Sequence, residues 1–216
     1  MLNSSRISEA DGGSEIGCAF CQRSSIHYVL KETLHFLLAA DHAPLVEGHL
    51  LVIPKDHYTC YGDVPAVLDE ELFALKREVQ QFFSQAYAPP VFWEHGVFKQ
   101  TVFHAHLHCF PWGRTGYRLE QALHESVVTT QEDIRRWYRE RGHYFYMEDA
   151  DVALLFEPEM SRYLSVVKDV FIRGMSLRGG KAEWRSPQQR YEERLPLIQA
   201  ITHHWEIYQR RGKICS

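Results

Sequence analysis

The sequence has no apolar run long enough to cross a bilayer. Its longest runs, residues 36–40 and 152–156, fall far short of the ~18–20 residues that a transmembrane helix needs. Residues 1–17 are polar and contain no apolar stretch of the kind found in signal peptides. We therefore expect a cytoplasmic protein with no membrane partner.

Cysteine and concentrated positive charge are also scarce. Five cysteines occur in 216 residues, and only Cys18 and Cys21 are close in sequence, which argues against a disulfide framework. The 24 basic and 28 acidic residues give a net charge of −4, and no segment gathers Lys and Arg as a surface for long nucleic acid would. The 45% hydrophobic and 24% charged fractions are typical of a soluble globular protein.

The pattern of apolar residues predicts a mixture of helices and strands. Apolar positions recur at helical spacing over residues 65–87, and two prolines follow. Strands are predicted on both sides of this helix, at residues 26–32, 33–40, 49–53, 91–94 and 101–110. Beyond residue 113 the sequence predicts a helix that starts at a Thr129–Glu132 capping box and ends near Arg141, strands at 143–147 and 152–156, and helices at 161–173 and 197–211.

Histidine is the residue that stands out from this background. Of 13 histidines, three alternate with apolar residues at His104, His106 and His108. On a strand these three rings would share one face about 6.5–7 Å apart, because the chain rises about 3.3 Å per residue. Such a row indicates a polar cleft, a metal or a ligand; the alternative is a solvated or hydrogen-bonded sheet face.

Residues 104–111, His-Ala-His-Leu-His-Cys-Phe-Pro, resemble the motif of the histidine triad (HIT) family. Residues 41–44, 48–57, 94–96 and 100–101 are similar, in the same order, to segments that precede the triad in that family. The resemblance covers roughly residues 18–112. It implies an α+β fold, with an antiparallel sheet backed by the long helix, and a homodimer that continues the sheet.

Three regions follow from the resemblance. Residues 1–16 read as a flexible tail, residues 17–113 as the HIT-like catalytic domain, and residues 114–216 as a mostly helical C-terminal extension packed on that domain. The extension carries no motif of its own. We expect it to cover the cleft and narrow the choice of substrate.

The resemblance implies covalent chemistry on a nucleotide. The middle histidine, His106, would attack the α-phosphate, and His108 would donate a proton to the phosphate or the leaving group. A neutral imidazole is a competent nucleophile at pH 7, and water readily resolves the nucleotidyl-imidazole. No organic cofactor is implied.

By the same resemblance, neighbouring residues would bind the nucleotide. Gln100 and Thr101 would donate to phosphoryl oxygens, and Asp41 would accept from the ribose hydroxyls, unless it merely caps the turn before a proline. His42 would line the base pocket. Phe36 is as compatible with the pocket as with the core.

The Cys18-x-x-Cys21 spacing is one that metal sites use, although two cysteines alone are weak evidence. Some members of the family complete such a knuckle with two histidines, which here are His57 and His104. The resemblance thus implies a structural zinc site. The competing interpretations are a redox pair and two ordinary buried thiols.

Three functions remain open at this stage. The first is a hydrolase of dinucleoside polyphosphates or nucleoside phosphoramidates. The second passes the nucleotidyl group to phosphate or another acceptor, as a nucleotidyltransferase or phosphorylase. The third is a non-catalytic nucleotide-binding adaptor. The transferase branch replaces the third histidine with glutamine, so His108 favours a hydrolase.

Overall fold

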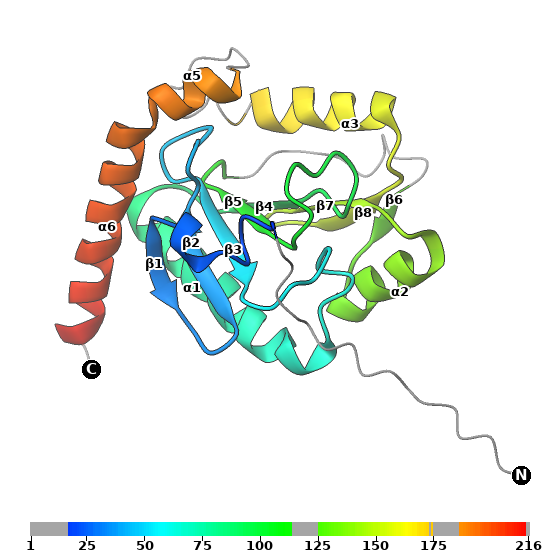
Figure 1. Ribbon diagram of the computed structural model, residues 1–216, viewed down its shortest axis with the longest axis horizontal. Coiled ribbons are helices and arrows are strands. Elements are labelled where there is room, and N and C mark those ends of the chain that lie inside the picture. Colours follow the sequence, from blue (N-terminus) through cyan, green and yellow to red (C-terminus); the bar gives the residue numbers. More distant parts are fainter. Residues whose placement is uncertain (1–16, 114–124, 173, 175–185, 215–216) are drawn as a thin grey trace, which may run out of the picture.

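The computed structural model describes residues 17–113, 125–172, 174 and 186–214 (Figure 1), so the predicted tail at 1–16 lies outside the described residues. The strands are β1 (Val29–Glu32), β2 (Phe36–Ala40), β3 (Leu50–Pro54), β4 (Val91–Glu94), β5 (Leu107–Phe110), β6 (Glu125–Val127), β7 (Phe145–Glu148) and β8 (Ala153–Phe156). The helices are α1 (Asp69–Ala86), α2 (Gln131–Arg141), α3 (Met160–Val166), α5 (Pro187–Glu192) and α6 (Arg194–Ile214), with the short turns η1 (Arg23–Ser25), η2 (Ala66–Leu68) and η4 (Val167–Ile172).

These strands form one antiparallel sheet in the order β1-β2-β3-β5-β4-β7-β8-β6. The first five strands come from the region that carries the motifs. The extension adds the other three. Strand β7 pairs with the edge of β4 that β5 leaves open, and β8 and β6 follow it in turn. The predicted α+β fold with a long helix behind an antiparallel sheet is confirmed, and the extension supplies strands as well as helices.

One face of the sheet is covered by α1, α2 and α6, as Figure 1 shows. Helix α1 buries five apolar residues along one side, Leu72, Leu75, Val79, Phe82 and Phe83. Alternate residues of the strands meet this side, because successive side chains of a strand point to opposite faces. Helix α6 lies beside β1, where the indole N–H of Trp205 donates to the carbonyl of Leu30.

The opposite face is covered in two parts. Over β4, β5, β7 and β8, helix α3 and η4 pack a second apolar cluster that contains Trp93, Phe110 and Phe171. At the β2–β3 end, the N-terminal segment places Phe20 and Ile26 on a third cluster. Between these two coverings the sheet carries the histidines.

Two local predictions are wrong. The strand expected over residues 101–110 begins only at Leu107, because residues 101–104 form bends and residues 105–106 have no regular structure. The capping box of α2 starts one residue later than predicted, because the carboxylate of Asp133 accepts from the backbone N–H of Thr129 and of Thr130. Among the described helices, none combines the length and apolar character that a bilayer span requires.

Candidate active site and metal centre

A cavity of about 530 Å³ lies on the histidine-bearing face of the sheet. Strand β5 and the bends before it supply His106 and His108, and the β2–β3 connection supplies Asp41 and His49. The remaining wall comes partly from the extension. Its lining residues there are Tyr163, Phe171, Pro187, Gln188, Arg190 and Tyr191.

Hydrogen bonding fixes which nitrogen of His106 is available for reaction. Its Nδ1 lies 2.6 Å from the carbonyl oxygen of His104, and a carbonyl can only accept. Nδ1 therefore carries the proton of the neutral ring. The lone pair of Nε2 is left for an electrophile in the cavity that His106 lines.

A second chain of bonds fixes the proton on His108. The backbone N–H of Leu45 donates to Nδ1 of His49 at 3.2 Å, so neutral His49 carries its proton on Nε2. That Nε2 lies 2.9 Å from Nδ1 of His108 and donates to it. The proton of neutral His108 must then be on its own Nε2, ready for donation to a group in the cavity.

Burial keeps these rings neutral. It lowers the pKa of His49 to about 4, and it lowers the pKa of His95, a further ring near His108, to about 4 as well. Burial also lowers the pKa of His106 and, most strongly, that of His108, whose neighbouring imidazoles add to the effect. At pH 7, His106 therefore offers an unprotonated Nε2 to the cavity and His108 offers an N–H donor, both on uncharged rings.

Some of the residues predicted to bind the nucleotide line the cavity, and others lie behind its wall. Asp41, His42 and Thr101 line the cavity. Asp41 also accepts from the backbone N–H of Ala43 at 2.7 Å, so it caps its turn and faces the cavity at once.

The other two candidates lie away from the cavity wall. The amide of Gln100 donates to the carbonyls of Thr59 and His104, at 3.1 and 2.8 Å. Gln100 thus supports the same His104 carbonyl that orients the His106 ring. Phe36 is fully buried in the core beneath α1, which settles its two interpretations in favour of packing.

The four predicted metal ligands converge on one point. Ligand atoms of Cys18, Cys21, His57 and His104 all lie within 4.8 Å of one another. The Sγ–Nδ1 distances are 3.4 Å for Cys18–His104, 3.3 Å for Cys21–His57 and 3.6 Å for Cys21–His104. Tetrahedral zinc with ordinary bond lengths separates sulfur and nitrogen ligands by about 3.6 Å, so this donor set fits the ion.

A carbonyl also prepares His104 for this position. Its Nε2–H donates to the carbonyl of Pro54 at 2.8 Å, which leaves Nδ1 unprotonated toward the thiols. Burial lowers the pKa of His104 to about 4, so the ring is neutral, as a metal ligand must be. Phe20 lies between the two cysteines in sequence. Its ring contacts the rings of His104 and His106, with centroid distances of 5.7 and 5.3 Å.

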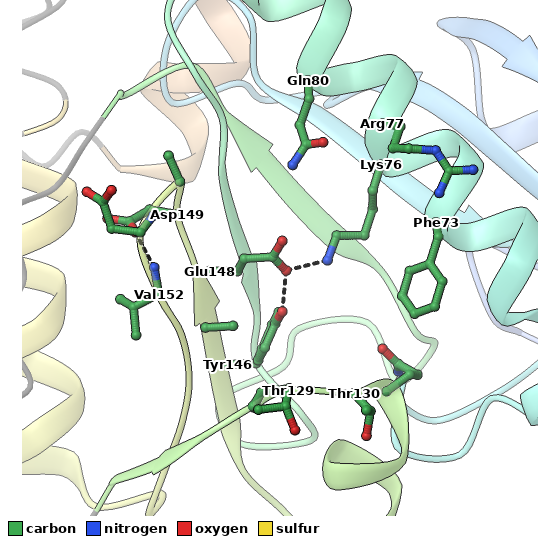
Figure 2. Close-up of a pocket in the computed structure, with 15 residues that line it drawn as sticks. Phe73, Lys76, Arg77, Gln80, Thr129, Thr130, Tyr146, Glu148, Asp149 and Val152 are labelled. Carbon is green, nitrogen blue, oxygen red and sulfur yellow. Dashed lines mark hydrogen bonds and ion pairs between the residues drawn. The ribbon is translucent and has the colours of Figure 1, made fainter.

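A second cavity, of about 430 Å³, lies between α1, α2 and the β7–β8 turn (Figure 2). At its centre Glu148 accepts from the ammonium of Lys76 and the hydroxyl of Tyr146, as the dashed lines show. That ammonium also lies 4.7 Å from the centre of the Phe92 ring. The charges of Lys76 and Glu148 at the centre of this second cavity thus compensate each other. None of the described residues that line the cavity is a histidine or cysteine.

Sequence reasoning missed several residues of the histidine cavity. His49 lies within the segment that resembles the family, but the sequence alone assigned it no role. The contributions of Tyr163, Phe171 and Arg190 carried no local signal, since their motif-free segments reach the cavity only through the tertiary fold.

Sequence comparisons match the part of the chain that carries these histidines. A family model describing the HIT domain matches residues 23–114. An uncharacterized HIT-like protein of Mycoplasma genitalium is 30% identical over 106 residues, which is 46% of this chain and 75% of the relative.

Solved structures with similarity include a hypothetical histidine triad nucleotide-binding protein of Sulfolobus tokodaii, 24% identical, with a TM-score of 0.40 over 58% of this chain and 97% of that one. A zinc-bound histidine triad family protein of Mycobacterium smegmatis is 27% identical, with a TM-score of 0.40 over 57% of this chain and 91% of that one. The assignment itself rests on the sequence matches and the ordered motifs: the chain belongs to the histidine triad (HIT) family.

Proposed function

We propose that the protein is a nucleotide hydrolase that cleaves at the α-phosphate through a covalent nucleotidyl-His106 intermediate. The observation that carries the proposal is the 2.6 Å contact between Nδ1 of His106 and the carbonyl of His104. It directs an unprotonated Nε2 to the cavity without any need for a separate base. Covalent catalysis of this kind divides one difficult displacement into two easier ones.

In the first step, Nε2 of His106 attacks the α-phosphorus. The N–P bond forms as the bond from phosphorus to the leaving group breaks, and the Nε2–H of His108 donates a hydrogen bond to the leaving atom. A phosphate departs as its anion, and an amine takes its proton from water. The bond from His49 to Nδ1 of His108 supports this donation, because it keeps the N–H on the nitrogen that a substrate would meet.

In the second step, water attacks the same phosphorus. The N–P bond breaks, and the nucleoside monophosphate departs with the oxygen and one proton of the water, while the other proton goes to solvent. Inorganic phosphate in place of water would release a nucleoside diphosphate, which is the phosphorylase alternative. Asp41 is suited to accept from ribose hydroxyls, and Thr101 to donate to a phosphoryl oxygen, as both line the cavity.

We further infer that Cys18, Cys21, His57 and His104 hold a structural zinc ion. When bound, the ion would link the N-terminal segment to the residues just before β5. Within the chain, the Pro54 carbonyl orients His104 and the intervening Phe20 packs on the His106 ring. Metal content measured by elemental analysis, for the purified protein and for Cys21→Ser, tests this inference.

The homodimer and the cytoplasmic location stay predictions. A second copy that continues the sheet would have to join at β1 or β6, because both edges of β4 are already paired, with β5 and with β7. Light scattering after gel filtration measures the number of chains.

The activity is tested with a panel of dinucleoside polyphosphates and nucleoside phosphoramidates, with and without inorganic phosphate, and the products are identified by mass. We expect nucleoside monophosphate without added phosphate, and no turnover by His106→Ala. The matched control is His27→Ala, which removes an exposed histidine outside the cavity. Quenching in base preserves the acid-labile N–P bond, so a mass increase on a His106 peptide reports the intermediate.

Each result has a distinct meaning. Nucleoside diphosphate formed only with phosphate would replace the hydrolase by a phosphorylase. Full activity in His106→Ala would refute the covalent mechanism. Nucleotide binding without turnover of any substrate would leave the adaptor as the better account.

A further inference from the structure

Helix α5 forms part of the wall of the histidine cavity, although it begins far beyond the matched HIT region. Ser186 caps the helix, its side chain accepting from the backbone N–H of Gln189, and Pro187 follows at the first helical position. The cavity lining includes Pro187, Gln188, Arg190 and Tyr191 from this helix. The HIT region ends at residue 114, so these contacts are particular to the extension.

Arg190 ties α5 to the loop that carries the predicted ribose ligand. Its Nη1 donates to the carbonyl of Ala43 at 2.9 Å, two residues beyond Asp41. The side chain is half-buried, and it lines the same cavity as His106 and His108. One guanidinium therefore anchors the helix and presents positive charge to the reaction site.

The described residues that line the cavity bring cationic side chains to it. They include Lys99 and Arg190 beside the carboxylate of Asp41, while the buried imidazoles are neutral. The positive charge of Arg190 adds to burial in lowering the pKa of both His49 and His108, which places the guanidinium within electrostatic reach of the proton donor.

A guanidinium is matched to phosphate in both charge and geometry, because its planar N–H groups bond two oxygens at once. A single scissile phosphate already has His106, His108 and Thr101 around it. The volume of about 530 Å³ leaves room for more than one phosphate group beside a nucleoside.

We propose that Arg190 is a specificity-determining residue that binds a phosphate beyond the scissile one, so that the substrate is a nucleoside polyphosphate or dinucleoside polyphosphate. The inference rests on the proposed hydrolase function and selects between its two substrate classes. A phosphoramidate with an uncharged amine as leaving group has no second phosphate for Arg190 to hold.

The test compares two substrates across four proteins. Diadenosine triphosphate and adenosine 5′-phosphoramidate are given to the wild type, Arg190→Gln, Arg190→Lys and the control Arg210→Gln, whose arginine is exposed on α6 and does not line the cavity. We expect Arg190→Gln to lower kcat/KM for the triphosphate about 10- to 100-fold, the range expected for one charged hydrogen-bonding pair.

For the phosphoramidate, the same variant should lose several-fold less, because it loses only the bond to the Ala43 carbonyl and no contact with a second phosphate. Arg190→Lys should recover part of the triphosphate activity, because it restores the charge without the planar fork. An equal loss for both substrates would show that Arg190 only holds the Ala43 loop. Unchanged kcat/KM for the triphosphate would refute any contact, and thermal unfolding confirms that each variant is folded.

A measurement of nucleotide binding tests this inference independently of the hydrolase proposal. By calorimetry, the wild type should bind adenosine diphosphate about 10-fold more tightly than adenosine monophosphate, and Arg190→Gln should bring this ratio close to one. If the wild type turns over neither substrate, the hydrolase proposal fails while this ratio still decides the part played by Arg190. Equal affinity of the wild type for the two nucleotides would overturn the inference.

Discussion

His104 and His106 are two residues apart, and the fold prepares them for opposite tasks. His104 donates from Nε2 to the Pro54 carbonyl and turns Nδ1 toward two thiols. His106 donates from Nδ1 to the His104 carbonyl and keeps Nε2 for the cavity. Both rings are buried and neutral, so the carbonyl that each ring meets, rather than its residue type or charge, decides which nitrogen is available.

This contrast predicts that catalytic activity and bound metal can be lost independently of each other. The largest belongs to His106→Ala, which we expect to lower kcat by about 10⁴-fold or more, because the covalent step loses its nucleophile. Metal content and the temperature of unfolding should stay near those of the wild type. Steady-state kinetics and elemental analysis on one preparation measure both, and metal loss in this variant would show that the two regions are not independent.

The converse change is Cys21→Ser, which removes one ligand of the metal cluster. We expect the bound metal to be lost and the temperature of unfolding to fall by about 10 °C, since a structural ion contributes several kcal/mol to folding. Calorimetry of the metal-loaded protein, with His106→Ala as the matched control, measures the shift. An unchanged unfolding temperature would mean that the cluster does not stabilise the fold.

Substitution of His49 tests whether orientation of the His108 ring contributes to the rate. His49→Ala should lower kcat about 100-fold with little change in KM, because His108 loses the bond that fixes its tautomer. His49→Gln should recover part of the rate, since an amide N–H can also donate to Nδ1 of His108. Equal rates for the two variants would show that the bond to His108 is not what matters.

The pH dependence follows from burial of the same rings. Burial lowers the pKa of His106 below its ordinary value of about 6.5, so the ring stays neutral, and kcat/KM should keep its plateau, at pH values below 6.5. The unfolded chain binds protons more readily than these buried rings do. The free energy of unfolding should therefore decrease as the pH falls from about 6.5 toward 4. A rate that falls with a midpoint near 6.5 would contradict this.

The smallest effect is expected where the two regions touch. Phe20→Ala removes the ring that packs between His104 and His106, and it should lower kcat about 3- to 10-fold while the metal stays bound. Phe103→Ala, at a largely exposed phenylalanine among the same bends, is the control. If Phe20→Ala and the control have the same rate, the knuckle does not position the nucleophile.

Local pattern was enough for the elements that bury a continuous apolar face. The strands β2 to β4, the helix α1 and the strands β7 and β8 lie close to their predicted ranges, because short continuous apolar runs and helical spacing reflect burial directly. The pattern failed at residues 101–106. There the alternation of histidine and apolar residues imitates a strand, whereas the bends are held by long-range bonds such as the one from Ala105 N–H to the Tyr58 carbonyl.

The sequence by itself determined the family, the α+β class and the set of chemically active side chains, because their types and order are written along one stretch of chain. Tertiary structure decided which nitrogen of His104 and of His108 is available, since the Pro54 carbonyl and the His49 ring that orient them approach from distant segments. It also decided that β7 occupies the edge of β4 and that Arg190 reaches the cavity. Contacts between segments so far apart follow from packing of the whole chain, and no local pattern records them.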